Sequence, residues 1–197
     1  MTERVVLATR NSHKVDEVRR ILSAQGVDIE IVPLPDDAPD VAETETTFAG
    51  NALLKARAIA EATGLAAIAD DSGLCVDALN GMPGVLSARW AGRHGDDVAN
   101  LQLVLGQMAD VPDGRRDAQF VCAAAWVVPG EREQFVEGVL EGTLAHAPRG
   151  SNGFGYDPIF VPLGYALTTA ELRPDEKDAI SHRGQAFRAL AQVMASR

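Results

Sequence analysis

Cysteine, aromatic residues and long hydrophobic runs are all scarce in this chain. Only two of the 197 residues are cysteines, Cys75 and Cys122, and neither lies in a CxxC pattern, which argues against a disulfide framework or a zinc site. No apolar run approaches the length of a membrane span, and the N-terminal run is too short for the core of a signal peptide. We therefore expect a cytoplasmic protein that does not enter a membrane.

Positive charge is also in short supply. The chain has 18 Lys plus Arg against 28 Asp plus Glu, which gives a formal net charge of -10 and a pI near 4.8. This balance argues against a nucleic acid or an anionic membrane as the main partner, so an anionic ligand would need a local basic pocket. The hydrophobic content of 46% and the chain length favour one globular domain spanning residues 1–197.

Hydrophobic spacing predicts helices that alternate with strands early in the chain and a long hairpin later. Together they indicate a mixed α/β fold, with helices on a sheet, rather than a purely parallel one. The predicted strands are 4–8, 28–32, 65–69 and 74–79, with a hairpin formed by 118–128 and 134–144. The predicted helices begin near Val15 and span 47–63, 96–108 and 185–194, and residues 80–95 are expected to be irregular.

The segment ATRNSHK, residues 8–14, follows the first predicted strand and opens a helix. Free backbone amides and the positive end of the helix dipole make such a place an anion site, and Lys14 adds a point charge. The alternative is that Asn11 or Ser12 only caps the helix while Lys14 is solvated. The GxxxxGK[ST] pattern of a Walker loop is missing.

Three carboxylates form the next candidate: Glu43 in VAETETTF and the pair Asp70 and Asp71 in AIADDSGL. An apolar strand that ends in carboxylates places them at the edge where open α/β sheets hold ligands, and a hard divalent cation prefers such oxygens. Neighbouring side chains of an extended chain point to opposite faces, so only one aspartate can face a given site. The alternative is that DDSG forms a tight turn.

Two further segments have the chemistry of a binding site. In GSNGFGYDPIFVP, Phe154 offers a flat face for a base, Asp157 offers acceptors to a ring N–H, and the glycines let backbone amides approach a ligand. The alternative is a packed bulge with the two aromatic rings in the core. In EKDAISHRGQAF, Ser181 precedes the last helix, and three basic side chains cluster before it; a solvated patch is the alternative reading. These are Lys177, His182 and Arg183.

These segments, in this order, resemble the inosine triphosphatase family, pyrophosphatases that act on the purine nucleotides dITP, ITP and XTP. The matches are Thr9, Asn11 and Lys14 in ATRNSHK; Glu43, Thr47, Phe48, Asn51 and Lys55 in ETETTFAGNALLKA; ADDSGL at 69–74; SARW at 87–90; GFGYDPIF at 153–160; and SHRG at 181–184. Two residues depart from the family pattern: Gly50 stands where glutamate is frequent, and Arg10 where glycine is common.

The resemblance implies a mixed, elongated β-sheet flanked by helices, two lobes with the nucleotide in a central cleft, a homodimer, and Mg²⁺-dependent hydrolysis of a purine nucleoside triphosphate to monophosphate and pyrophosphate. It implies that Asp71 is the catalytic carboxylate and a metal ligand, with Glu43 as a second metal ligand. The substrate-binding residues that it implies are Thr9, Arg10, Asn11, Ser12, His13, Lys14, Ser72, Phe154, Gly155, Tyr156, Asp157, Lys177, His182 and Arg183.

Two other functions remain as alternatives. One is a regulator that binds purine nucleotides without cleaving them, although a pure triphosphate binder gains little from clustered carboxylates. The other is a metal-dependent phosphatase or nucleotidyl transferase of different specificity.

Overall fold

The computed structural model describes residues 3–27 and 29–196 and divides into two compact units. Unit 1 comprises the segments up to Asp71, Cys122–Gly138 and those from Arg183 onward, and unit 2 comprises Ser72–Val121 and Val139–His182. The chain therefore passes between the units several times, and three long strands contribute residues to both. The expectation of one domain over residues 1–197 stays a prediction.

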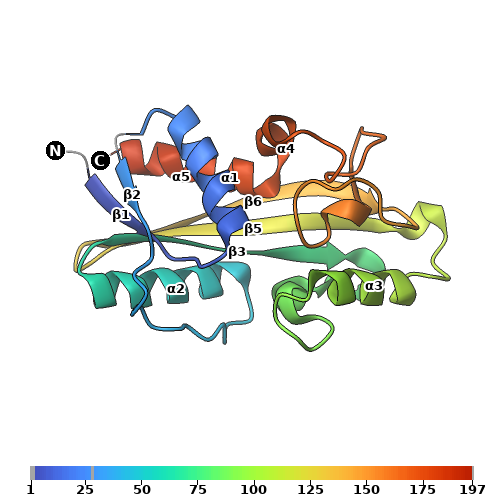
Figure 1. Cartoon of the computed structure of the whole chain (residues 1–197), viewed down its shortest axis with the longest axis horizontal. Helices are drawn as coiled ribbons and strands as arrows, with labels where there is room; N and C mark the ends of the chain where they lie inside the picture. Colours follow the sequence, from blue (N-terminus) through green and yellow to red (C-terminus); the bar gives the residue numbers. More distant parts are fainter. Residues whose placement is uncertain (1–2, 28, 197) are drawn as a thin grey trace. The chain divides into compact units, whose positions relative to one another are not determined.

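Unit 1 contains helices on both faces of its part of the sheet: α1 and α5 cover one face and α2 the other (Figure 1). Its complete elements are β1 (Glu3–Leu7), α1 (Ser12–Ala24), β2 (Ile29–Val32) and α2 (Phe48–Thr63), together with most of α5 (His182–Ala195). The strands that it shares with unit 2 are β3 (Ala66–Val76), β5 (Asp117–Val128) and β6 (Arg132–Leu144).

The alternation of side chains along the strands builds two separate cores in unit 1. On β3, Ala66 and Ile68 pack with α1 and α5, whereas Ala67 and Ala69 pack with α2. β1 and β5 divide their residues between the faces in the same way. Because successive strand residues point to opposite faces, the next two residues of β3, Asp70 and Asp71, also belong to opposite faces.

Unit 2 has its own core, in which Leu74 and Val76 of β3 pack with Leu101 and Val104 of α3. Its other elements are β4 (Met82–Pro83), α3 (Asp97–Gln107), β7 (Phe160–Pro162), α4 (Pro174–Ile180) and four short 3-10 helices, at Asp77–Leu79, Gly84–Arg89, Asp113–Arg115 and Asp157–Ile159.

The sheet is mixed, as the sequence predicts. Its strand order is β2-β1-β3-β5-β6-β7, with β4 paired to β3. β1 runs parallel to both β2 and β3, whereas β7 runs antiparallel to β6. The predicted hairpin is confirmed by the neighbouring strands β5 and β6, whose short connection requires them to be antiparallel.

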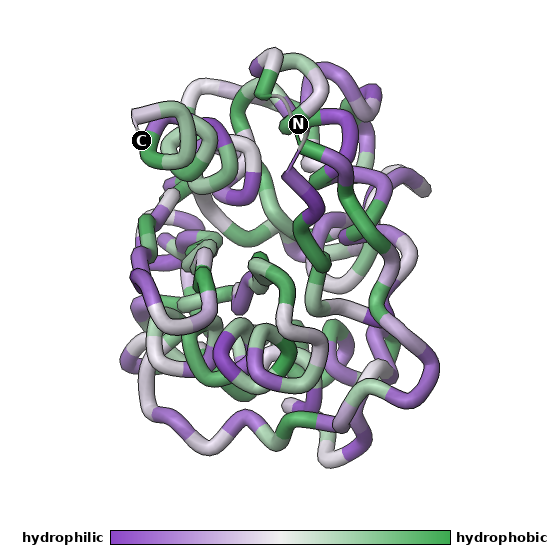
Figure 2. The backbone as a smooth tube through the Cα atoms, turned by 90° about the vertical axis from the view of Figure 1, so that its left-hand side faces the viewer, coloured by the Kyte–Doolittle hydropathy of each residue, from purple (hydrophilic) through white to green (hydrophobic). Residues whose placement is uncertain are grey.

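The helix predicted over 47–63 is confirmed, and its ends have the expected caps. Thr47 is the N-cap, and its hydroxyl accepts a hydrogen bond from the Gly50 amide at 3.0 Å. Gly64 ends the helix in the left-handed conformation, with φ of 66°. No described helix is long and apolar enough to cross a membrane, and hydrophobic stretches along the backbone are short (Figure 2).

Three local predictions differ from the structure. DDSG is not a turn, because β3 continues unbroken through residues 70–73; sheet pairing and buried partners for both carboxylates override the turn preference of these residue types. The last helix begins three residues earlier than predicted, and α4 was not predicted at all. Asp28, the first residue of the predicted second strand, lies outside the described residues.

Candidate functional site

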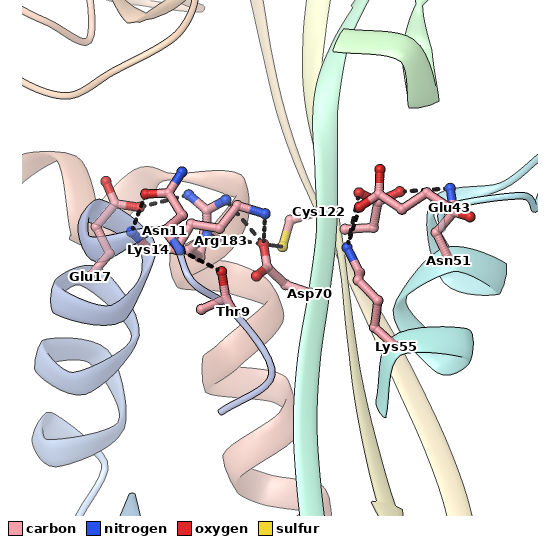
Figure 3. A network of polar contacts seen from close by, with 11 residues as sticks. Thr9, Asn11, Lys14, Glu17, Glu43, Asn51, Lys55, Asp70, Cys122 and Arg183 are labelled. Atoms are coloured by element: carbon pink, nitrogen blue, oxygen red, sulfur yellow. Dashed lines mark hydrogen bonds and ion pairs between the residues drawn. The ribbon is translucent and has the colours of Figure 1, made fainter. Parts of the chain in front are cut away.

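Asp70 lies on the face of β3 that α1 and α5 cover, where two cations meet its carboxylate. Lys14 Nζ lies 3.0 Å from Asp70 Oδ2, and an Arg183 terminal nitrogen, Nη2, lies 3.1 Å from the same oxygen. Arg183 also donates to Glu17 Oε2 at 2.6 Å. Helices α1 and α5 are thus joined to the strand by a buried ion network (Figure 3).

The surroundings of Asp70 hold it in the charged form. Burial alone would raise the pKa of this carboxyl, but the charges of Lys14, Arg183 and Lys55 outweigh it and hold the pKa well below its usual range. Conversely, burial would lower the pKa of Arg183, and Asp70 and Glu17 raise it instead. Asp70 and Arg183 therefore hold each other in the charged form.

Asp71 lies on the opposite face, toward α2, where three side chains surround it. The Asn51 amide donates to Asp71 Oδ2 at 3.0 Å. Lys55 Nζ lies 3.4 Å from Asp71 Oδ1 and 2.7 Å from Glu43 Oε1, so one ammonium bridges two carboxylates. Glu43, Asn51 and Lys55 converge on this side of the strand in Figure 3. α2 places Asn51 and Lys55 one turn apart, which puts both on one face of the helix.

The two adjacent aspartates have pKa shifts of opposite sign. Burial raises the pKa of Asp71; Lys55 opposes that rise, and the nearby charge of Glu43 adds to it. Burial lowers the pKa of Lys55, but Asp71, Asp70 and Glu43 together raise it, so this lysine stays protonated. A pair of carboxyls with separated pKa values is the arrangement in which one stays a fixed anion and the other exchanges a proton.

Glu43 and Asp71 are the described residues best suited to a divalent cation. No group of three or more His, Cys, Asp or Glu side chains in the described part of the chain has metal-binding geometry. The two carboxylates nevertheless share one cationic partner, Lys55 Nζ. Magnesium commonly takes one or two protein carboxylates and completes its shell with water and phosphate oxygens, so this donor pair fits it.

The loop between β1 and α1 begins beside the part of β3 that leads to Asp70 and Asp71. β1 pairs with β3 only as far as Ile68, and Asp70 and Asp71 lie beyond that point. Asn11 is the N-cap of α1, and its side chain accepts from the Lys14 amide at 3.3 Å. The capping prediction is confirmed, but Lys14 is not a solvated side chain, because it is paired with Asp70.

The other members of this loop lie as follows. The Thr9 hydroxyl accepts from the Asn11 amide at 3.2 Å, and Ser12 and His13 are exposed in the first turn of the helix. Arg10 reaches away to the 33–40 connection, where it donates to the Ala38 carbonyl at 2.8 Å. Its guanidinium therefore anchors that connection.

In unit 2, the glycine-rich loop is organised around the buried carboxylate of Asp157. Asp157 Oδ2 accepts from the Phe154 amide at 2.8 Å and from Lys177 Nζ at 2.6 Å, and Oδ1 accepts from the Thr169 hydroxyl at 2.8 Å. Lys177 Nζ also lies 5.2 Å from the centre of the Phe154 ring. The sequence predicted that the Asp157 carboxylate binds a base, but in the structure it forms buried hydrogen bonds that hold the loop in place.

The remaining residues of this loop are divided between the core and the surface. Tyr156 is buried in the core, and its hydroxyl donates to the Ser87 carbonyl at 2.8 Å. Phe154 is only half-buried. The Gly155 amide donates to Asp97 at the start of α3. The packed-bulge alternative therefore describes Tyr156, while the Phe154 ring keeps an accessible part.

The predicted cluster of three basic side chains before the last helix is wrong as stated. Lys177 belongs to α4 and pairs with Asp157, whereas His182 and Arg183 are the first residues of α5. The His182 ring stacks on Phe120 with centroids 4.7 Å apart. Each of these side chains has a separate buried environment, so a solvated patch is also excluded. Ser72 follows Asp71 on β3 and is half-buried.

Sequence reasoning missed the roles of Glu17, Asn51 and Lys55. Asn51 and Lys55 appear in the segment that carries the resemblance, and their spacing of four residues was the available signal. No sequence signal pointed to Glu17, because its partner Arg183 is 166 positions away in the chain.

Comparison with known proteins shows the family and the fold. The model of the Ham1 family matches residues 5–193. A protein of Streptomyces coelicolor named dITP/XTP pyrophosphatase is 60% identical over 193 residues, covering 97% of this chain and 96% of its own length. A protein of Mycobacteroides abscessus with the same name is 55% identical, covering 97% of this chain and 94% of its own length.

Solved structures of similar chains have the same fold. A HAM1 protein from Coxiella burnetii superposes with a TM-score of 0.89 at 43% identity, covering 99% of this chain and all of that one. The Ham1 protein of Staphylococcus aureus superposes with a TM-score of 0.87 at 37% identity, covering 98% of this chain and 99% of that one. The family model spans nearly the whole chain, and the chain belongs to the Ham1 family.

Proposed function

We propose that this protein hydrolyses non-standard purine nucleoside triphosphates, dITP, ITP and XTP, to the monophosphate and pyrophosphate. The observation that carries the proposal is the pair Glu43 and Asp71, two carboxylates joined by the Lys55 ammonium on the α2 side of β3. The names of the relatives in Streptomyces coelicolor and Mycobacteroides abscessus support the same reaction.

The phosphate chain is assigned to the loop that leads into α1 and to nearby cations. The N-terminus of α1 offers backbone amides and the positive end of its dipole, and Thr9 to Lys14 form the loop that leads into it. Lys14 and Lys55 supply positive charge: Lys14 pairs with Asp70, and Lys55 pairs with Glu43, whose charge helps to raise the Lys55 pKa. Ser72 is assigned to the same end of the substrate. The reaction leaves a highly charged pyrophosphate, so fixed cations lower its barrier.

Glu43 and Asp71 are the residues that would hold Mg²⁺. When bound, the ion would neutralise charge on the phosphate oxygens. Asp71 orients the attacking water and accepts its proton on the carboxylate, which the Asn51 amide holds in place. Burial and Glu43 raise the pKa of Asp71, and a higher pKa makes a carboxylate a better proton acceptor.

The base is assigned to the glycine-rich loop around Phe154. Phe154 provides a ring face for stacking, and Lys177 lies over that ring. Asp157 positions both of them from the core, with Gly155 and Tyr156 fixing the loop around it. Stacking on an aromatic side chain contributes about 1–3 kcal/mol per base in single-stranded nucleic-acid sites.

Selection among purines is assigned to hydrogen-bond donors near the base. Hypoxanthine and xanthine have a 6-oxo acceptor where adenine has an amino donor. His182 and nearby amides are the donors proposed for this role, because the structure commits the Arg183 guanidinium to Asp70 and Glu17. A buried donor left without its acceptor costs about 1–3 kcal/mol, so a few such mismatches exclude ATP.

The proposal is tested by incubating the protein with dITP and Mg²⁺ and identifying the products. Monophosphate plus pyrophosphate supports it. Diphosphate plus phosphate indicates the alternative phosphatase, and binding without cleavage indicates a regulator. Either of the last two results overturns the proposal.

The catalytic assignment has its own test in Asp71→Asn. Removal of a general base costs about 10²–10⁴-fold in rate, and nucleotide binding should be largely retained. Asp117→Asn, at an exposed aspartate of β5, is the matched control and should keep the wild-type rate. Near-normal turnover by Asp71→Asn would show that another group takes the proton.

The proposal extends to the cellular setting. A nucleotide-pool enzyme acts in the cytoplasm, and the net charge of -10 disfavours nucleic acid as a partner. We also propose a homodimer, as the resemblance implies. Light scattering coupled to size exclusion gives the mass in solution and tests the dimer directly.

A further inference from the structure

Asn51 occupies a position between the two acidic segments of the candidate metal site. It lies in the first turns of α2 and its side chain is fully buried. Its Nδ2 donates to Asp71 Oδ2 at 3.0 Å, and its Oδ1 accepts from the Glu45 amide at 3.0 Å. One side chain therefore joins β3 to the segment that carries Glu43.

The contact with Asp71 determines which carboxylate oxygen is available. The Asn51 amide donates to Oδ2. Lys55 Nζ, which also pairs with Glu43, approaches the other oxygen, Oδ1. A carboxylate whose one oxygen is fixed by an amide donor cannot rotate freely about its last bond. Asn51 thus directs Oδ1 toward Glu43.

The contact with Glu45 fixes the backbone of the Glu43 segment. Residues 39–45 form neither helix nor strand, so regular hydrogen bonding does not determine their path. The Glu45 amide is two residues from Glu43 and bonds to the Asn51 side chain. The amide side chain of Asn51 donates to one segment while accepting from the other.

From these contacts we propose that Asn51 is a positioning residue that sets the distance and orientation between Glu43 and Asp71 for a divalent cation. The inference rests on the proposed function, because it takes these two carboxylates as the metal ligands. Removing a side chain that hydrogen-bonds to a metal ligand typically lowers metal affinity or activity by about 10–100-fold.

The test compares Asn51→Ala and Asn51→Leu with wild type. Leucine keeps nearly the shape of asparagine and removes both hydrogen bonds, so it separates their loss from a cavity. The probe is Mn²⁺ without nucleotide, titrated by electron paramagnetic resonance. Both variants should bind Mn²⁺ about tenfold or more weakly, and at saturating Mg²⁺ the loss should appear in kcat more than in KM for dITP.

Asn100 provides matched controls. It is equally buried, and its side chain joins α3 to the 88–91 segment by accepting from the Ala91 amide and donating to the Ala88 carbonyl. Asn100→Ala and Asn100→Leu should lose comparable thermal stability but keep wild-type Mn²⁺ affinity.

Wild-type Mn²⁺ affinity in folded Asn51→Leu would overturn the inference, as would an equal loss of affinity in the Asn100 variants. Failure of the proposed function gives a different result, since wild type would then release no pyrophosphate from dITP. The two failures are therefore read from separate measurements.

Discussion

Gly153→Ala tests how the glycine-rich loop depends on Asp157. Gly153 has φ of 74°, in the left-handed region, and a Cβ built on it would lie 2.1 Å from Asp157 Oδ2 and 2.8 Å from Asp157 Cγ. The alanine methyl and the carboxylate cannot share this space. Asp157 must move, and its oxygen Oδ2 then leaves both the Phe154 amide and Lys177.

Two costs add to give the expected loss of stability. The left-handed backbone conformation costs about 1–2 kcal/mol for a residue with a Cβ. Each buried polar group that loses its partner costs about 1–3 kcal/mol more, and two donors are affected. We expect the free energy of unfolding to fall by roughly 3–8 kcal/mol in total.

Gly155→Ala is the control, because it separates backbone strain from the collision. Gly155 also has a positive φ, 61°, but an added Cβ there meets nothing within 4 Å. It should cost only about 1–2 kcal/mol. Urea unfolding followed by circular dichroism measures both variants, with unchanged m-values as the condition for comparing them. If the two variants differ by less than about 1 kcal/mol, Asp157 does not hold the loop as described.

The remaining predictions concern buried groups. Burial raises the pKa of the Cys122 thiol to about 12. Iodoacetamide at pH 8 should therefore modify half-buried Cys75 first and Cys122 only after unfolding, as measured by peptide mass spectrometry. Early labelling of Cys122 would contradict its burial. Because the folded pKa of Asp70 lies below its ordinary 3.8, its charge stabilises the fold above that value and the effect is lost as pH falls through the folded pKa. Asp70→Asn should therefore be most destabilising at neutral pH and approach wild type in acid denaturation series; a pH-independent difference would refute this. Arg116 is buried and donates to four backbone carbonyls, so Arg116→Met should lower the melting temperature with a loss of roughly 3–5 kcal/mol, and a loss below 1 kcal/mol would show that water replaces it.

The opposed directions of Asp70 and Asp71 were predictable from the sequence, because alternation is a local property of an extended chain. The side chains that pair with each carboxylate were not predictable from the sequence. Lys14 and Arg183 reach Asp70 from helices at opposite ends of the chain. Local turn preference even gave the wrong structure for DDSG, since the pairing that keeps it in a strand comes from other segments.

The loop around Phe154 shows the same division. Its glycines predicted backbone conformations that other residues avoid, and Gly153 has one. The expectation that Asp157 faces a base came from residue type alone. The structure turns that carboxylate inward, because Lys177 and Thr169 are brought to it by later segments of the chain.

By itself, the sequence determined the mixed α/β class, the capped helix over 47–63, the hairpin and the segments that carry the chemistry, because periodicity, caps and motif spacing are local. Tertiary structure alone decided which cation neutralises which carboxylate and which aspartate shares an ammonium with Glu43. The physical reason is that charge interactions depend on distance and burial, and both are set by segments far apart in the chain.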